Sequence, residues 1–185
     1  PLGPNDSDVL ADASMPGARW FPRMRLNYVD QVLAHDGRPG TAIVGVAEDG
    51  ERGELSWSGL ADQVSRLAGT LEDLGVGEGD VVAAYLPDVP ETVVAFLATA
   101  TLGALWSGCG QDYAPEGAAA RLGQLRPKVL FTSTGYRFNG KLVDKNADNA
   151  ELAGLLPGLA AHIVVTPVDG PPAPAGVRDF AGAVA

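Results

Sequence analysis

Apolar residues recur at helical spacing between about residue 57 and residue 74. They follow one another at steps of four and three, which places them on one face of a helix. These residues are Leu60, Val64, Leu67, Leu71 and Leu74. Gly75 stands where a glycine commonly follows the last helical residue. A shorter run with the same spacing, from Leu26 to Leu33, predicts a second helix that stops before Gly37.

Short, mostly apolar runs occupy residues 81–86, 104–107, 129–133 and 162–166. Runs of this kind are typical of strands that are buried on both faces of a parallel sheet. Predicted helices separate them, starting near Pro90, near Pro115 and around residues 151–156. Because strand and helix alternate, the sequence predicts an α/β fold with a mainly parallel sheet, flanking helices and right-handed crossovers.

The segments outside this alternation differ in composition. Residues 1–18 are rich in turn formers and small residues, and are expected to be disordered or an artificial leader, with order beginning near Arg19. An apolar, β-branched run over 41–49 ends at a turn dipeptide and predicts a β-hairpin at the start of an α/β region that extends to residue 168. Residues 169–185 are rich in Pro, Gly and Ala and resemble a linker-like tail.

Composition narrows the function classes. The formal net charge of −10 argues against nucleic acid as a partner, because binding to its phosphates requires a basic surface. The longest mostly apolar stretch, from Val93 to Trp106, is shorter than the roughly 20 residues of a membrane-spanning helix. The single cysteine, Cys109, cannot form an internal disulfide, and no signal peptide is evident. We therefore expect a cytoplasmic location and no membrane contact.

The common local motifs of catalysis do not occur in the sequence. There is no Walker loop, GxGxxG, HExxH, CxxC pair or GxSxG. Cys109 follows a predicted strand without a histidine nearby to activate it, so a passive role is favoured. His35 and His162 have no second ligand at metal spacing, and both are interpreted as structural. No catalytic residue and no metal ligand is assigned.

Two cations form the one candidate anion site. Arg137 and Lys141 lie four residues apart beside a flexible Asn-Gly pair, so they can converge on a phosphate as charge-assisted donors. The alternative is a solvated basic loop in an acidic protein. The string TSTG at residues 132–135 is interpreted as an ordinary strand end rather than a phosphate cradle.

Three segments resemble acyl-CoA synthetases of the acetyl-CoA and acetoacetyl-CoA synthetase branch. They are WFPRMRLNY at 20–28, the stretch from LSWSGLADQV to APEG at 55–117, and PKVLFTSTGYRFNGK at 127–141. The Trp-Phe pair, the LWSGC string and GYRFNGK look closer to the acetoacetyl-CoA synthetases. The resemblance implies that residues 19–40 are an N-terminal extension and that 41–168 is the first α/β part of the large N-terminal, AMP-binding domain.

The resemblance also implies a chemistry and a set of site residues. Such enzymes use ATP with Mg²⁺ to convert a carboxylate into an acyl-adenylate, and the thiol of CoA then releases AMP. Arg137 and Lys141 look like the basic pair that meets CoA phosphates, although Lys141 requires a one-residue gap. Gly110, Gln111 and Asp112 match the loop beside the CoA nucleotide, where acetyl-CoA synthetases have small residues and Asp112 would repel a phosphate.

The leading hypothesis is an N-terminal fragment of an acetoacetate–CoA ligase. In that family the ATP loop and the C-terminal domain follow later, so the fragment alone is expected to be inactive and to bind neither ATP nor CoA tightly. The alternatives are an acetyl- or propionyl-CoA synthetase, and a freestanding non-catalytic module that binds CoA, a nucleotide or a protein through an exposed sheet edge. A dehydrogenase is disfavoured, because YLPDVPE rather than a glycine loop follows the first buried strand.

Overall fold

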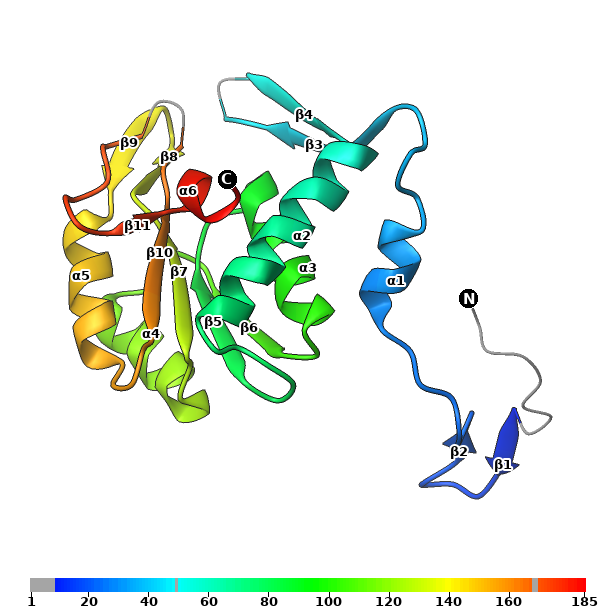
Figure 1. Cartoon of the computed structure of the whole chain (residues 1–185). Coiled ribbons are helices and arrows are strands. Elements are labelled where there is room, and N and C mark those ends of the chain that lie inside the picture. Colours follow the sequence, from blue (N-terminus) through cyan, green and yellow to red (C-terminus); the bar gives the residue numbers. More distant parts are fainter. Residues whose placement is uncertain (1–8, 49, 168–169) are drawn as a thin grey trace.

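The computed structural model describes residues 9–48, 50–167 and 170–185, and its centre is a five-stranded sheet (Figure 1). The strands are β5 (Val81–Tyr85), β6 (Leu105–Cys109), β7 (Val129–Ser133), β10 (Ala161–Val165) and β11 (Arg178–Asp179). They lie in the order β6-β5-β7-β10-β11, and every neighbouring pair is parallel. The parallel α/β fold predicted from the sequence is therefore confirmed.

Helices cover both faces of the sheet (Figure 1). One layer consists of α2 (Trp57–Asp73), α3 (Pro90–Thr101) and the short α6 (Phe180–Ala183). The other consists of α4 (Pro115–Leu122), its 3₁₀ extension η1 (Gly123–Leu125) and α5 (Asn146–Leu155), which begins earlier than predicted. Side chains of β5 alternate between the two cores, with Val82 and Ala84 in the first and Ala83 and Tyr85 in the second.

The helix α2 has the ends that its sequence predicts. The Ser56 hydroxyl accepts a hydrogen bond from the Gly59 amide at 3.1 Å and caps the first turn. At the other end, Gly75 has a φ of +79°, and its amide donates to the Glu72 carbonyl. The Val76 amide donates to the Leu71 carbonyl, which completes a Schellman motif. The predicted apolar face of α2 is buried against α3 and the sheet.

Among the described residues, two antiparallel hairpins extend from the body outside the central sheet, in addition to an antiparallel strand pair in the N-terminal segment. The predicted one pairs β3 (Thr41–Val46) with β4 (Arg52–Ser56), although Asp49 of its turn lies outside the described residues. The second pairs β8 (Gly135–Phe138) with β9 (Lys141–Asp144) and was not predicted. Asn139 and Gly140 both have positive φ angles, of 50° and 73°, as a two-residue type I′ turn requires. The Asn-Gly pair is therefore a tight turn rather than a flexible loop.

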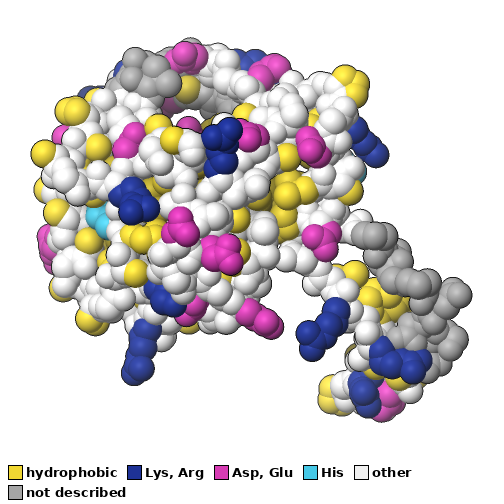
Figure 2. All heavy atoms as spheres, viewed as in Figure 1, with side chains coloured by type: hydrophobic (Ala, Val, Ile, Leu, Met, Phe, Trp, Pro, Cys, Tyr) yellow, Lys and Arg dark blue, Asp and Glu magenta, His cyan; other side chains and the backbone are white. Residues whose placement is uncertain are grey.

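The N-terminal segment forms an arm that projects from the body (Figure 1). Its strands β1 (Leu10–Asp12) and β2 (Arg19–Trp20) pair with each other, and the chain then reaches α1 (Tyr28–Leu33). The side chain of Asn27 donates to the Ala100 carbonyl at 2.7 Å and fixes α1 against α3. Of the predicted leader at 1–18, the structure describes residues 9–18, which include β1, while residues 1–8 lie outside the described part. Lys and Arg lie close together on this arm and are more scattered over the visible face of the body (Figure 2).

The C-terminal segment does not behave as the linker-like tail that its composition predicted. Although residue 169 lies outside the described residues, β11 pairs in parallel with β10 and extends the sheet. Phe180 is buried, with its ring centroid 6.4 Å from that of Phe131, and the Thr70 hydroxyl donates to the Ala183 carbonyl. A few contacts with the core therefore stabilise β11 and α6, although Pro, Gly and Ala dominate the composition of this segment.

The apolar stretch from Val93 to Trp106 is shared between α3, a turn and β6. Within the described residues, no helix has both the length and the apolar character needed to cross a membrane.

Replacing Phe180 with alanine tests whether the C-terminal segment belongs to the core. We expect the substitution to lower the free energy of unfolding by about 3 to 5 kcal/mol, because it removes a buried aromatic ring and leaves a cavity. Urea unfolding of the 185-residue chain measures the change. Leu155→Ala, at a side chain that is 45% exposed, is the control and should change stability by about 0.5 kcal/mol or less. Equal effects of the two variants would contradict the burial of Phe180 in the core.

His162 should make the stability of the chain depend on pH. Its ring lies 2.8 Å from the Thr132 hydroxyl, and burial lowers the pKa of the imidazole. The unfolded chain therefore binds a proton more readily than the folded chain, so stability should fall as the pH drops through about 6.5. Urea unfolding between pH 5 and pH 8 should show this loss, and His162→Gln should flatten it. An NMR titration that gives His162 an unshifted or raised pKa would refute this prediction.

Candidate functional site

The strand order creates a crevice at the carboxyl end of β5. From β5 the chain passes through α3 on one face to β6, and from β6 through α4 on the other face to β7. The strand order thus reverses direction beside β5, and loops that leave the sheet there diverge. Parallel α/β sheets bind their ligands at such a switch point, outside the carboxyl ends of the strands.

A cleft of about 240 Å³ lies at this place. Segments that follow different strands meet around it. The lining residues are Leu86, Pro87 and Asp88 after β5, Gly110, Gln111 and Asp112 after β6, and Tyr136 of β8. Three of the five residues predicted to face CoA, Gly110 to Asp112, therefore line a cleft at the switch point of the sheet.

The residues that line the cleft include acidic and polar side chains. Its lining residues in the described chain include Asp88 and Asp112, both exposed, and no Lys or Arg. The carboxylate of Asp112 lies against Gly110, where an added Cβ atom would come within 2.5 Å of Oδ1. A side chain at position 110 would therefore displace the Asp112 carboxylate from this position. Such a surface favours neutral or hydrogen-bond-donating groups over phosphates.

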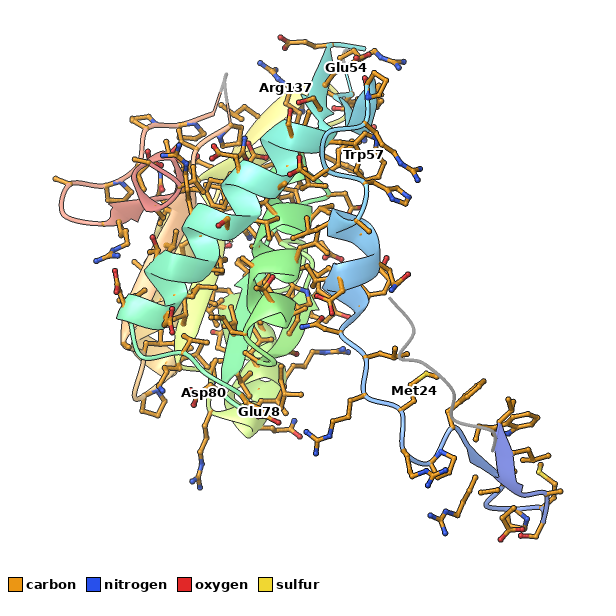
Figure 3. The ribbon with its side chains drawn as sticks, turned by 45° about the vertical axis from the view of Figure 1, so that its right-hand side comes forward. Met24, Glu54, Trp57, Glu78, Asp80 and Arg137 are labelled. Atoms are coloured by element: carbon orange, nitrogen blue, oxygen red, sulfur yellow. The ribbon has the colours of Figure 1, made fainter. Side chains whose placement is uncertain are left out.

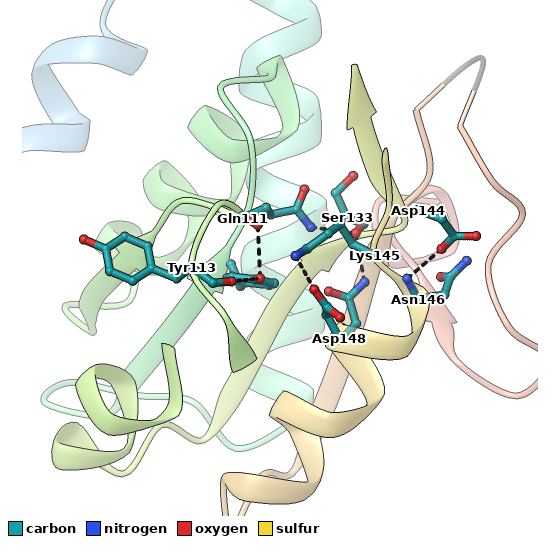
Figure 4. Close-up of polar contacts among 9 residues, drawn as sticks. Gln111, Tyr113, Ser133, Asp144, Lys145, Asn146 and Asp148 are labelled. Atoms are coloured by element: carbon teal, nitrogen blue, oxygen red, sulfur yellow. Dashed lines mark hydrogen bonds and ion pairs between the residues drawn. The ribbon is translucent and has the colours of Figure 1, made fainter. Parts of the chain in front are cut away.

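Buried hydrogen bonds hold the loop that carries these residues (Figure 4). The Tyr85 hydroxyl lies 2.5 Å from the Tyr113 carbonyl and 3.1 Å from the Gln111 carbonyl. The Gln111 side-chain amide donates to the Ser133 carbonyl at 2.7 Å. Asn149 of α5 donates to the same carbonyl at 2.8 Å. The loop is therefore tied to the ends of both β5 and β7.

A buried cation, Lys145, lies beside Tyr85 in this network. Lys145 forms an ion pair with Asp148, and its ammonium group lies 5.4 Å from the centroid of the Tyr85 ring. Burial by itself would lower the pKa of Lys145, but Asp148 and the Tyr85 hydroxyl raise it overall. Burial also raises the pKa of Tyr85, against a smaller opposing effect of Lys145. Both groups therefore keep their usual protonation at neutral pH, with an ammonium cation beside a neutral phenol.

The two predicted cations lie on the β8–β9 hairpin. Figure 3 shows Arg137 at the end of the sheet opposite Asp80. Tyr136 pairs with Val143, Arg137 with Leu142 and Phe138 with Lys141. Because neighbouring residues of a strand point to opposite faces, Lys141 shares a face with Tyr136, which lines the cleft, and Arg137 points to the other face. The prediction that both cations converge on one phosphate is not supported by this register. Both side chains are exposed.

The tip of this hairpin is attached to the other hairpin. The amides of Asn139 and Gly140 donate to the two carboxylate oxygens of Glu48, at 2.6 and 3.0 Å. Two successive amides on one carboxylate form a compact anion contact. This contact fixes the hairpin near the carboxyl end of the sheet.

The remaining candidates from the sequence have internal roles. Cys109 ends β6, and burial raises the pKa of its thiol, which fits the passive role predicted for it. In the TSTG string, the hydroxyl of Ser133 donates to the Gly135 carbonyl and that of Thr132 contacts His162. His35 packs edge-on against Trp57. Among the described residues, no group of three or more His, Cys, Asp or Glu side chains is placed to hold a metal ion.

Sequence patterns did not point to Tyr85, Tyr136, Lys145 or Asn149. Tyr85 sits in an apolar run, where its ring suggests only a core residue. The available signal was the Asn-Gly pair flanked by strand-forming residues, since it is a strong indicator of a hairpin and would have placed Tyr136 on a strand.

Comparisons with known proteins agree with the geometry. The sequence model of the family described as "AMP-binding enzyme" matches residues 33–182. An acetoacetyl-coenzyme A synthetase of Rhizobium meliloti (strain 1021) is 37% identical over 170 residues, which cover 91% of this chain and 26% of that protein. A malonamoyl-CoA synthetase of Penicillium aethiopicum is 32% identical over 165 residues, which cover 86% of this chain and 23% of that protein.

A solved structure is similar over almost the whole chain. The acetoacetyl-CoA synthetase from Streptomyces lividans is 43% identical, with a TM-score of 0.87, over 96% of this chain and 28% of that one. The chain thus spans about a quarter of the length of the relatives that it matches.

Proposed function

Because the chain belongs to the AMP-binding enzyme family, we propose that it forms part of an acid–CoA ligase, with acetoacetate as its acid. The observation that carries the proposal is the cleft at the switch point, which is lined by Gly110, Gln111 and Asp112. These are the residues that the resemblance matches to the loop beside the CoA nucleotide. Relatives named for acetoacetyl-CoA synthesis support the choice of acid.

The proposed reaction has two steps that share one site. A carboxylate oxygen of the acid attacks the α-phosphorus of ATP, and pyrophosphate leaves with its Mg²⁺. The sulfur of CoA then attacks the acyl carbon, and AMP leaves with the oxygen that joined it to the acyl group. None of the 185 residues is assigned to the chemistry of either step, so the chain by itself is proposed to be inactive.

The role of this chain in the reaction is to receive part of CoA. A cleft of about 240 Å³ is smaller than the roughly 300 to 1,000 Å³ of sites that enclose a drug-sized ligand, so only a portion of CoA fits. The carboxylates of Asp88 and Asp112 suit N–H donors, such as the adenine amine or the pantetheine amides. The phosphates then lie outside the cleft, where Lys141 on the same face of the hairpin as Tyr136 can neutralise them.

Exchange of labelled pyrophosphate into ATP tests the ligase activity in the complete natural protein. We expect exchange to depend on added acid and to be fastest with acetoacetate, because forming the adenylate requires a carboxylate but no CoA. Acetate and propionate are the comparison acids. Faster exchange with either of them would refute acetoacetate as the acid. No exchange with any acid, together with CoA binding, would replace the ligase with a non-catalytic binding module.

Lys141→Ala should weaken CoA binding by the 185-residue chain more than Arg137→Ala does. Removing one exposed phosphate contact is expected to cost about 1 kcal/mol or less, which is roughly fivefold in affinity at low salt. A ¹H–¹⁵N NMR titration with CoA at two salt concentrations measures this change. The effect should shrink at high salt, because exposed charges are screened.

Arg66→Ala is the matched control, since Arg66 is an exposed cation on α2 that pairs with Asp62. It should leave CoA binding unchanged. Binding that weakens equally in all three variants would reflect net charge and not a site. A wild-type chain whose residues 110–112 do not respond to CoA would refute the proposed position of the ligand.

A further inference from the structure

The hydroxyl of Tyr85 is placed to determine the shape of the loop that lines the cleft. Tyr85 ends β5, and its side chain is 0% exposed. Its oxygen lies within hydrogen-bond distance of two carbonyls of the loop, those of Gln111 and Tyr113. A hydroxyl has a single proton, so the shorter contact, to Tyr113, is the principal hydrogen bond. One buried atom thus controls the backbone on both sides of Asp112.

Tyr85 is itself held from several directions. Its ring packs in the second core beside Leu130 and Leu152, and the Lys145 ammonium lies over it. A cation over an aromatic ring is attracted to the ring face, and Asp148 fixes the cation in turn. The hydroxyl therefore has little freedom to follow the loop if the loop moves.

The loop has a second anchor at a different strand. Gln111 is buried, and its side-chain amide donates to the carbonyl of Ser133 at the end of β7. With Tyr85 on β5, the two anchors stand on the two strands that bound the switch point. Between them, Gly110 and Asp112 remain at the surface of the cleft.

We propose that Tyr85 is a positioning residue for the CoA-facing loop, which it acts on through its hydroxyl without touching the ligand. This inference rests on the proposed function, because it takes CoA as the molecule that the loop receives. Because the Tyr85 side chain is buried, it can affect ligand binding only through the backbone of the loop. Binding to a loop that is already ordered avoids the entropy cost of ordering it, so the hydroxyl should contribute to CoA affinity.

Tyr85→Phe separates this role from simple packing, because phenylalanine keeps the ring and removes only the hydroxyl. The carbonyls of Gln111 and Tyr113 then lose their buried donor. We expect backbone ¹⁵N order parameters of residues 110–113 in the 185-residue chain to fall from about 0.85, typical of rigid backbone, towards about 0.6. The order parameters elsewhere should not change.

Thr99→Val is the matched control. It removes another buried hydroxyl, which donates to the Ala95 carbonyl inside α3, far from the cleft. Its effect on the loop should be negligible. Order parameters of residues 110–113 that are the same in Tyr85→Phe and in the wild type would overturn the proposal.

The link to CoA is tested by comparing the two half-reactions in the complete ligase. Tyr85→Phe should lower kcat/KM for CoA about tenfold, the effect of leaving a buried carbonyl unpaired. Acid-dependent pyrophosphate exchange, which needs no CoA, should be unchanged. An equal loss in both half-reactions would indicate a general structural defect and overturn the proposal.

The failure of this inference differs from the failure of the proposed function. If the wild-type chain binds CoA and Tyr85→Phe binds it equally well, Tyr85 has no positioning role and the proposed function stands. If the wild-type chain does not bind CoA at the cleft, the proposed position of the ligand fails and the CoA part of this inference fails with it, whereas the ligase function fails only if the complete protein shows no acid-dependent pyrophosphate exchange. The order parameters still decide whether Tyr85 holds the loop.

Discussion

The complete burial of β5 is the constraint on which the rest of the structure depends. All five of its residues are buried, because it has a hydrogen-bonded strand at each edge and a helical layer on each face. The connections to its two neighbours run over opposite faces of the sheet, so they diverge at its carboxyl end. The position of the cleft therefore follows from connectivity and does not depend on a single side chain. Small residues such as Ala83 and Ala84 allow both helical layers to approach the strand closely.

The sequence predicted the elements whose burial is uniform along their length. The apolar runs at 81–86, 129–133 and 162–166 became the strands β5, β7 and β10, and the stripe of leucines became the buried face of α2. The sequence did not predict the strands and helices with few core contacts, because their composition resembles that of loops. In β11 and α6 the buried Phe180 stands among Pro, Gly and Ala. In β8 and β9 the strands are exposed on much of their surface, and only the conformation of Asn139 and Gly140 marks the turn between them.

In the candidate site, too, the sequence predicted some residues and not others. Gly110, Gln111 and Asp112 were found because they are adjacent in sequence and resemble one family loop, and the structure places them at the cleft. The hydrogen-bond partners of Gln111, Tyr85 and Ser133, are separated from it by 26 and 22 positions in the chain numbering. No local pattern contains a contact between residues so far apart. The spacing of Arg137 and Lys141 was equally uninformative, because whether two cations converge depends on strand register and not on their separation in sequence.

The charge of the cleft has a consequence for how a polyanion can bind there. Asp88 and Asp112 make the interior of the cleft unfavourable for phosphate, yet CoA carries several phosphate charges. The two requirements are compatible if different elements receive different parts of the ligand. In the proposed function, the loop at the end of the sheet would receive hydrogen-bond donors, and the β8–β9 hairpin, held by Glu48, would present Lys141 to the phosphates. Under that proposal, the loop would provide specificity through its shape, whereas the hairpin would provide attraction that depends on ionic strength.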